Sequence, residues 1–296
     1  MISIAENMDE FDIAQEIRLE RQVHKGSFLL VEGDTDIKRF TKFTDSNRCS
    51  TVNCFGRKNL LGAIALLYDE GFPGALGLAD ADFDRIDGSL LEHEGVIYSE
   101  GHDFDIDWTC KEVFARYLEE VAHSDKCEAV GGVVGVHEYV MNSVRPLSVL
   151  RFVSVTKNLH LPLKRVKHHE ISRDAMIDLD LMINHVAVGV HAAHDKRIMI
   201  RDLVVNHAKI EFEKLQLTNG HDFLAMLGVA LQSKLGDRKI PQTWGSEIEL
   251  HFRLAYSDDD FLASSLFVAI INWQDENPPY LILKPSLVAR RGERGL

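Results

Sequence analysis

The sequence predicts an α/β protein with a parallel sheet flanked by helices and a mainly helical C-terminal extension. In the N-terminal third, short apolar runs alternate with stretches of helical spacing, as in a parallel sheet with its connecting helices. Each run stops at a turn or at acidic residues, which is typical of buried strands. After Trp108 helical spacing dominates. We therefore expect a sheet domain over residues 22–107 and an extension over residues 108–296.

The expected sheet has four strands. They cover residues 27–31, 51–55, 75–79 and 95–98. Between them, residues 36–43 and 59–68 have the apolar spacing of helices. Thr35 and Asp36 are the expected caps of the first of these helices. Residues 9–21 meet helical spacing only in part, so this lead-in is either a short helix or an irregular segment.

The extension is expected to be helical with two strand-like pieces. The strand-like pieces are residues 149–155 and 164–167. Helical spacing covers residues 108–122, 127–150, 175–184, 196–214, 222–232 and 247–267. The extension has no repeats. It either binds substrate or a partner, or completes the site formed by the sheet domain.

Composition excludes several classes of protein. No apolar run approaches the roughly 20 residues that span a bilayer, and the N-terminus is acidic and polar, so we expect a cytoplasmic protein without membrane contact. The 4 cysteines have no CxxC spacing, which argues against a disulfide framework. The net charge of −13 argues against broad electrostatic binding of nucleic acid. Any such binding therefore needs a local basic patch or a metal ion.

Carboxylates directly follow two of the expected strands. Glu32 follows the expected strand 27–31, and Asp80 and Asp82 follow the expected strand 75–79. Ligands of open α/β sheets bind at the carboxyl ends of the strands, so we expect these side chains to converge. Converging carboxylates repel one another unless a cation lies between them, and a hard divalent ion suits such oxygen ligands. The expected ion is Mg²⁺, with Mn²⁺ as the alternative. A solvated turn residue is the other interpretation of Glu32.

The segments LLVEGDTDIKRF and GLADADFD together resemble the Toprim domain, whose signatures are apolar-Glu-Gly-x-x-Asp and then apolar-Asp-x-Asp. Topoisomerases, bacterial primases, a ribosomal-RNA maturation nuclease and the OLD (overcoming lysogenization defect) nucleases share this fold. The segments look most like the subgroup with the Toprim effectors of PARIS anti-phage systems, which act beside an ABC-type ATPase. By motif, the resemblance covers residues 25–107 and implies a Toprim-like sheet.

The resemblance implies Mg²⁺-dependent cleavage of phosphodiester bonds, with a tRNA-type RNA as the substrate of the PARIS effector. It makes Glu32 a metal ligand or general acid/base, and Asp80 and Asp82 the paired metal-binding aspartates. Asp84 extends this pair to three alternating aspartates, so which of them bind metal stays open. The strong acidity suits a toxic effector held by a partner ATPase. Because nucleases often act in pairs, we expect a homodimer in the active state.

Other polar residues near the motifs have two interpretations each. Asp34 and Asp36 either support the metal ligands or cap the following helix. His221 is either a proton-transfer group or part of an ordinary turn before Asp222, the expected N-cap. The residues after the fourth strand either add metal ligands or only cap and turn the chain; these are His102, Asp103 and Asp105.

Residues 163–169 form a dense basic stretch. Lys164, Arg165 and Lys167 are candidates for contact with the phosphates of a nucleic acid, and a solvated edge is the alternative. Arg145, Arg151 and Lys157 are candidates to extend this stretch.

Three histidines raise the question of a zinc site. They are His185, His191 and His194. No cysteine or glutamate completes a recognisable ligand set around them, so we expect surface or packing histidines.

Three other functions stay open. An OLD-type DNA endonuclease or nickase would use the same carboxylates on DNA. A non-catalytic, partner-binding subunit would use them only to stabilise the fold. A nucleotide-sugar transferase would use Asp80-x-Asp82 for its metal but gives Glu32 no role. A topoisomerase needs a tyrosine nucleophile on a separate domain, and the sequence has no such module, so hydrolysis is the expected reaction.

Overall fold

The structure is a computed structural model that describes residues 8–189, 194–236 and 244–291. The chain forms two compact units. The first consists of Met1–Asp80, Leu90–Ser99 and Ser257–Leu296, and the second of Ala81–Ser89 and Glu100–Tyr256. This division differs from the expected boundary at residue 107, because the last helices belong with the sheet.

The first unit contains an all-parallel sheet of four strands in the order β2-β1-β3-β4. The strands are β1 (Ser27–Val31), β2 (Cys49–Asn53), β3 (Ala75–Ala79) and β4 (Val96–Tyr98). Strands β1 and β3 are buried along their whole length, as their continuous apolar runs predict. Strand β2 ends earlier than expected because Phe55 and Gly56 take positive φ angles of 53° and 126°. The predicted α/β class with a parallel sheet is confirmed.

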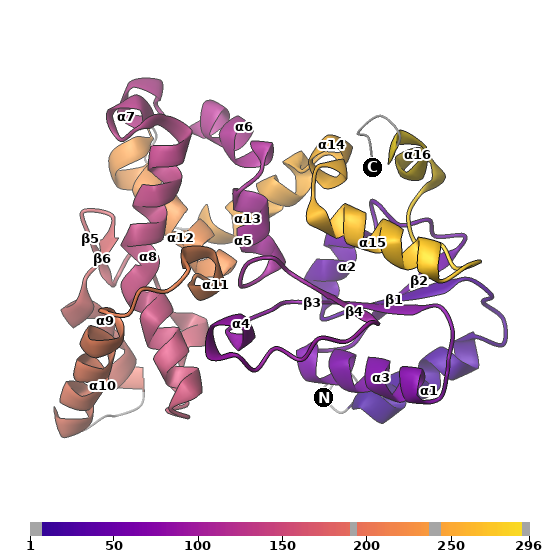
Figure 1. The fold of residues 1–296 in the computed structure, drawn as a ribbon. Coiled ribbons are helices and arrows are strands. Elements are labelled where there is room, and N and C mark those ends of the chain that lie inside the picture. The colour runs from indigo at the N-terminus through magenta and orange to yellow at the C-terminus, as the bar shows by residue number, and fades with distance from the viewer. Residues whose placement is uncertain (1–7, 190–193, 237–243, 292–296) are drawn as a thin grey trace, which may run out of the picture. The chain divides into compact units, whose positions relative to one another are not determined.

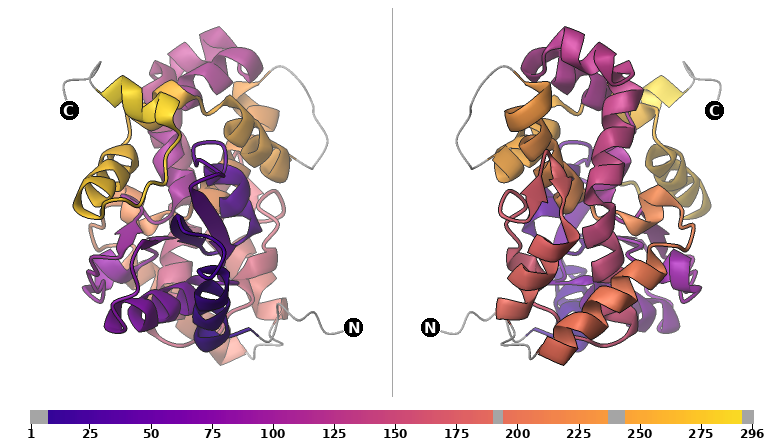
Figure 2. Two further views of the ribbon diagram at one scale, coloured as in Figure 1. Left: turned by 90° about the vertical axis from the view of Figure 1, so that its right-hand side faces the viewer. Right: turned by 90° about the vertical axis from the view of Figure 1, so that its left-hand side faces the viewer.

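Helices cover both faces of this sheet. Helices α1 (Glu10–Glu20) and α3 (Arg57–Asp69) lie side by side on one face (Figure 1, Figure 2). Helix α15 (Ser265–Glu276) lies on the opposite side of the sheet (Figure 1). The core under α1 and α3 is made of alternate residues of the strands with one side of each helix; it includes Ile13, Ile17, Phe28, Leu30, Leu60 and Ile64.

The helix caps settle the form of the lead-in segment and correct the expected cap of the helix after β1. The lead-in is a regular helix, because Asp9 and Asp12 form a capping box at the start of α1. The helix after β1 is α2 (Asp34–Phe40), and its N-cap is Gly33, which offers no side chain. The prediction that Thr35 and Asp36 cap this helix is therefore wrong. Two further short helices, α14 (Asp258–Leu262) and α16 (Pro285–Ala289), complete the first unit.

The second unit is mainly helical, as the extension was expected to be. Its longest helix is α8 (Gly132–Thr156), against which α10 and α12 pack. The others are α4 (Asp84–Asp87), α5 (Phe104–Thr109), α6 (Glu112–Val121), α7 (Ser124–Ala129), α9 (Leu179–Gly189), α10 (His194–His207), α11 (Lys214–Leu217), α12 (Gly220–Ala230) and α13 (Trp244–Ala255). A small hairpin joins β5 (Ser172–Arg173) to β6 (Met176–Ile177).

Both strand predictions in this unit are wrong. Residues 149–155 lie inside α8, and most of them are buried; a buried helical segment cannot be told from a strand by periodicity alone. Residues 164 and 165 belong to a single 3₁₀ turn, Leu163–Arg165, and residues 166 and 167 form no strand. The expected helix over 108–122 is broken between α5 and α6, and the one over 175–184 begins only at Leu179, after β6.

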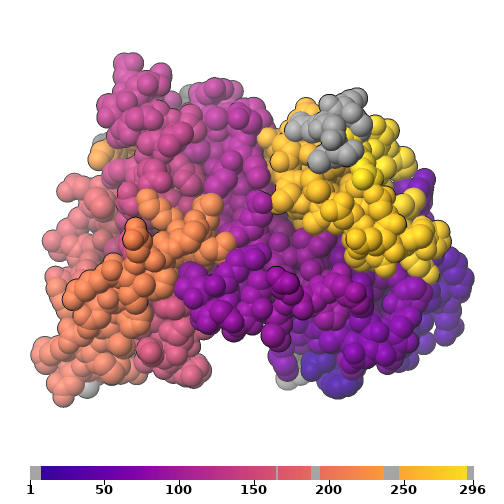
Figure 3. All heavy atoms as spheres, in the orientation of Figure 1, coloured from indigo at the N-terminus to yellow at the C-terminus, as the bar shows by residue number. Residues whose placement is uncertain are grey.

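Helix α10 lies at the surface of the second unit (Figure 3) and exposes several apolar side chains, Ile198, Met199 and Val205 among them. Among the described helices, none combines the length and the apolar character needed to cross a membrane.

Candidate functional site

Glu32 and Asp80 are the residues that directly follow β1 and β3, two neighbouring parallel strands. The Asp80 backbone N–H donates a hydrogen bond of 2.8 Å to Glu32 Oε1. Both residues are partly buried. The first unit thus brings together two of the predicted site residues at the carboxyl edge of its sheet.

The loop after β2 fixes the backbone of Glu32. The Gly56 N–H donates to the Glu32 carbonyl oxygen at 2.8 Å, and the Cys54 N–H donates to Val31 at 2.9 Å. Burial, and then the negative charge of Glu32, raise the pKa of the Cys54 thiol. Cys54 is therefore an inert core residue, whose raised pKa comes first from its burial.

The two aspartates of α2 have structural partners. Asn53 donates to Asp34 Oδ1 at 2.7 Å, which ties the start of α2 to the end of β2. Asp36 forms an ion pair of 2.7 Å with Arg39, whose side chain is almost completely buried. Asp36 thus compensates a buried cation.

Glu32 and Asp80 have the right chemistry for Mg²⁺. This ion is usually bound through one or two carboxylates and keeps several waters or substrate phosphate oxygens as its other ligands. Among the residues that the structure describes, no group of three His, Cys, Asp or Glu is arranged to hold a metal ion. The pair therefore fits an ion that shares its ligands with water and substrate, and it does not fit a closed protein cage.

Asp82 follows Asp80 by two residues and belongs to the second unit. Its φ angle is +50°, an uncommon conformation in which Asp is enriched. Its N–H donates to the carbonyl oxygen of His102 at 2.7 Å, and its Oδ1 lies 3.8 Å from His102 Nε2. The second unit thus places His102 beside Asp82. Asp84 is the first residue of α4, where an acidic side chain is favourable.

Asp103 has the capping role that the sequence left open. It is the N-cap of α5 and accepts hydrogen bonds of 2.8 Å from the N–H groups of Ile106 and Gly220. Burial, with a further contribution from the charge of Asp105, raises the pKa of Asp103 to about 6. Asp105 lies in the first turn of the same helix. Asp103 thus joins the start of α5 to the start of α12.

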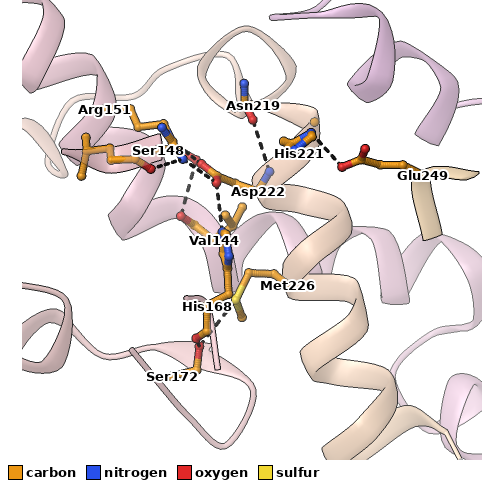
Figure 4. Close-up of polar contacts among 12 residues, drawn as sticks. Val144, Ser148, Arg151, His168, Ser172, Asn219, His221, Asp222, Met226 and Glu249 are labelled. Carbon is orange, nitrogen blue, oxygen red and sulfur yellow. Dashed lines mark hydrogen bonds and ion pairs between the residues drawn. The ribbon is translucent and has the colours of Figure 1, made fainter. Parts of the chain in front are cut away.

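Sequence reasoning missed a buried charged cluster, which Figure 4 shows around Asp222. Asp222 Oδ1 accepts from Arg151 Nη2 at 2.8 Å and lies 2.9 Å from His168 Nε2, and Arg151 Nε donates to the other carboxylate oxygen. Burial by itself would raise the pKa of Asp222, but the hydrogen bonds and charges of His168 and Arg151 outweigh it and lower the pKa to about 2.

The predicted N-cap role of Asp222 is wrong, because Asn219 is the N-cap of α12 and accepts the Asp222 N–H at 3.2 Å. An acidic residue in the first turn of an otherwise apolar helix was the available signal. The partners of Asp222 lie 71 and 54 residues away along the chain, and no sequence pattern predicts that they meet it.

The basic stretch is anchored by this cluster. Arg151 Nη2 donates to the Leu163 carbonyl oxygen at 3.0 Å, and His168 is held by Asp222. Lys164 is exposed, and Lys167 pairs with Glu170 at 2.8 Å. The side chain of Arg165 lies outside the described part of the structure.

The other cations expected to extend the basic stretch differ in their surroundings. Arg145 donates to the carbonyl oxygens of Ala208 and Ile210, so its guanidinium is used within the second unit, like that of Arg151. Lys157 is exposed after the end of α8.

Two of the histidines considered in the sequence, His221 and His185, lie beside acidic side chains. His221 Nδ1 lies 2.7 Å from Glu249 Oε1 (Figure 4), and this hydrogen bond raises the pKa of His221. His185 lies 3.6 Å from Glu170. His191, the middle residue of the three considered for zinc, lies outside the described residues.

No protein-family model matches this chain, and no curated protein matches its sequence.

Proposed function

We propose that this protein is a Mg²⁺-dependent phosphodiester hydrolase of the Toprim type that cleaves RNA, with tRNA as the first candidate substrate. The observation that supports it most is the hydrogen bond between the Asp80 N–H and Glu32 Oε1. This contact joins the ends of two parallel strands, the usual position of ligand sites in open α/β sheets. The carboxylate of Glu32 and the backbone of Asp80, two residues of the Toprim-like signatures, meet there.

Glu32 and Asp80 are the residues of the first unit that would hold the ion. When bound, Mg²⁺ supplies charge neutralisation at the phosphate and lowers the pKa of a bound water. The Asp80 N–H orients the Glu32 carboxylate, which can then accept a proton at its oxygen atoms. Asp82 and Asp84 join the proposal through their places in the sequence motif. Mn²⁺ has the same oxygen preference and is the natural substitute in experiments.

The proposal includes a toxic effector role in anti-phage defence, an ABC-type ATPase partner, a homodimer in the active state and a cytoplasmic location. The net charge of −13 supports restraint by a partner, because such a chain is repelled by nucleic acid over most of its surface. The exposed Lys164 in the anchored basic stretch is the proposed contact with phosphate.

The test compares wild type with Glu32→Gln, Asp80→Asn and the control Asp69→Asn, an exposed acid at the end of α3. Each variant is expressed with and without a co-expressed ABC-type ATPase, and cell growth, total RNA and plasmid DNA are followed. Discrete cleavage of small RNAs that is lost in the two site variants and retained in the control supports the proposal. Intact RNA with nicked plasmid would favour the DNA endonuclease, and cleavage that survives both substitutions would refute the site.

One observation favours a second candidate, the non-catalytic partner-binding subunit. Glu32 Oε1 already accepts a hydrogen bond from the Asp80 backbone N–H, a structural role that needs no ion. In this case Mg²⁺ would not bind to the purified wild-type protein in a calorimetric titration. The proposed nuclease, in contrast, binds the ion in wild type and loses binding in Glu32→Gln.

A further inference from the structure

A pocket of about 460 Å³ opens on the second unit, beside the β5–β6 hairpin and the end of α12. Its polar wall includes His169, Asp174, Gln232 and Ser233, and its apolar wall includes Ala175 and Val229. This pocket shares no lining residue with the proposed metal site. Three structural features shape its walls: a tight turn, a π-helical segment and a hydrogen-bond link to the Asp222 cluster.

The first feature is the turn of the hairpin. Strands β5 and β6 pair Arg173 with Met176, so Asp174 and Ala175 form a two-residue turn, and both have positive φ angles, 50° and 56°. This is the geometry of a type I′ turn, which favours Asn, Asp and Gly. The Tyr139 hydroxyl donates to the carbonyl oxygens of Asp174 and Ala175 at 3.0 and 3.3 Å. The turn that carries Asp174 is thus held in an uncommon conformation.

The second feature is a π-helix. Helix α12 continues into five π-helical residues, Leu231–Leu235, and the Gly236 N–H donates to the Leu231 carbonyl oxygen at 2.8 Å. Short π-helical segments are rare and frequently lie at functional sites. This one carries Gln232 and Ser233, both of which line the pocket.

The third feature is a connection to the buried Asp222 cluster. Ser172, another residue of the pocket wall, donates its hydroxyl to the carbonyl oxygen of His168 at 2.6 Å. His168 is in turn held by Asp222 at 2.9 Å (Figure 4). The wall formed by residues 168–172 is therefore positioned before any ligand binds.

The lining groups match a flat heterocycle with N–H donors beside an acceptor. The Asp174 carboxylate accepts hydrogen bonds, the Gln232 carboxamide both donates and accepts, and the imidazole of His169 offers a stacking surface. Guanine presents two adjacent N–H donors and a carbonyl oxygen on its Watson–Crick edge. Proteins read unpaired RNA bases in this way, by stacking and by hydrogen bonds to the exposed edge.

We propose that this pocket binds guanine, as a free nucleotide or as an unpaired residue of an RNA. The exposed Lys164 lies in the segment that leads into the pocket wall and suits the adjoining phosphates. Binding of the free nucleotide is independent of the proposed nuclease function. The idea that the guanine belongs to an RNA rests on the proposed nuclease function.

The test is a calorimetric titration of the full-length protein, without added metal, with guanosine, inosine and adenosine 5′-monophosphates. We expect guanosine monophosphate to bind, the inosine nucleotide, which lacks the 2-amino group, to bind more weakly, and the adenosine nucleotide not to bind. Asp174→Asn should weaken guanosine monophosphate binding by about tenfold or more, as expected for loss of a hydrogen bond to a charged group. Asn is favoured in type I′ turns, so the fold should persist, and Asp69→Asn is the matched control.

No binding of guanosine monophosphate to wild type, or equal binding to Asp174→Asn, would overturn the pocket assignment. A second arm titrates RNA hairpins with one unpaired guanosine or inosine, and a preference for guanosine that disappears in Asp174→Asn identifies RNA as a source. Absent nucleotide binding together with metal-dependent cleavage that needs Glu32 overturns only the pocket. Nucleotide binding together with cleavage that survives Glu32→Gln and Asp80→Asn overturns only the metal site.

Discussion

The backbone N–H of Asp80 and the Oε1 atom of Glu32 lie 2.8 Å apart. These two residues are 48 positions apart in the chain, and the parallel pairing of β1 with β3 brings them to the same edge of the sheet. The contact gives Glu32 a structural role in addition to its proposed chemical one, and the two roles can be separated by substitution.

Glu32→Gln keeps an oxygen that can accept the Asp80 N–H, whereas Glu32→Ala leaves that donor without it. Both substitutions remove the negative charge. We therefore expect Glu32→Ala to lower the free energy of unfolding by about 1 kcal/mol more than Glu32→Gln does. Urea denaturation followed by circular dichroism measures the difference. Equal losses for the two variants would show that the hydrogen bond does not stabilise the fold.

Added Mg²⁺ should stabilise wild type because an ion that binds only the folded state raises the free energy of unfolding. At an ion concentration about ten times the dissociation constant, the gain is about 1.4 kcal/mol. Glu32→Gln should show no gain, while Asp69→Asn should behave like wild type. Thermal unfolding with and without Mg²⁺ at constant ionic strength measures this. A gain of the same size in Glu32→Gln would place the ion elsewhere.

Asp222→Asn should be strongly destabilising, since Arg151 would lose the charge that balances it in a largely buried setting and His168 would lose its carboxylate partner. We expect a loss of roughly 3 kcal/mol. Glu70→Gln is the matched control, because Glu70 also accepts two hydrogen bonds from one arginine, Arg18, but with its side chain 52% exposed. That substitution should cost less than about 1 kcal/mol. Similar losses of unfolding free energy in Asp222→Asn and Glu70→Gln would show that burial does not make the Asp222 contacts more important for stability.

Three carboxyl groups contribute to the dependence of stability on pH. Burial raises the pKa of Asp103 and of Asp107 to about 6, so the folded state binds their protons more tightly and stability increases as the pH falls from above 6 toward 4. The pKa of Asp222 is lowered to about 2. Its contribution is therefore complete above its ordinary pKa and is lost as the pH falls toward 2.

Chemical denaturation of wild type and Asp107→Asn between pH 2 and 8 checks these signs. Wild type should be less stable at pH 7 than at pH 5, and Asp107→Asn should flatten this slope. A wild-type stability that rises between pH 5 and pH 7 would contradict the prediction.

Gly220→Ala should disrupt the junction between α5 and α12. A Cβ atom at this position would lie 2.5 Å from Asp103 Oδ1 and 2.5 Å from the Ile106 nitrogen. We expect a loss of about 1–3 kcal/mol, as for other overpacked sites. Gly33→Ala is the control, because nothing lies within 4 Å of the added Cβ and its φ of −161° suits any residue. Urea denaturation of both variants tests the difference. A free energy of unfolding for Gly220→Ala equal to that of wild type would contradict the prediction.

The sequence by itself determined the strands 27–31 and 75–79 and the acidic residues that end them. Their apolar runs are continuous because both faces of a parallel strand are buried, and the carboxyl ends of parallel strands share one edge, so Glu32 and Asp80 could be expected to meet. It also determined that residues after Trp108 are mainly helical.

Only the tertiary structure decided the rest. Residues 149–155 carry the apolar run of a strand and yet continue α8, because a mostly buried helix segment has little polar surface to set its period. Asp222 was expected to cap a helix, but Arg151, 71 residues away, and His168 turn its carboxylate into the core. Local sequence patterns predict many helix caps and the spacing of apolar residues. The position of a buried charge depends on partners far away in the chain, which no local pattern predicts.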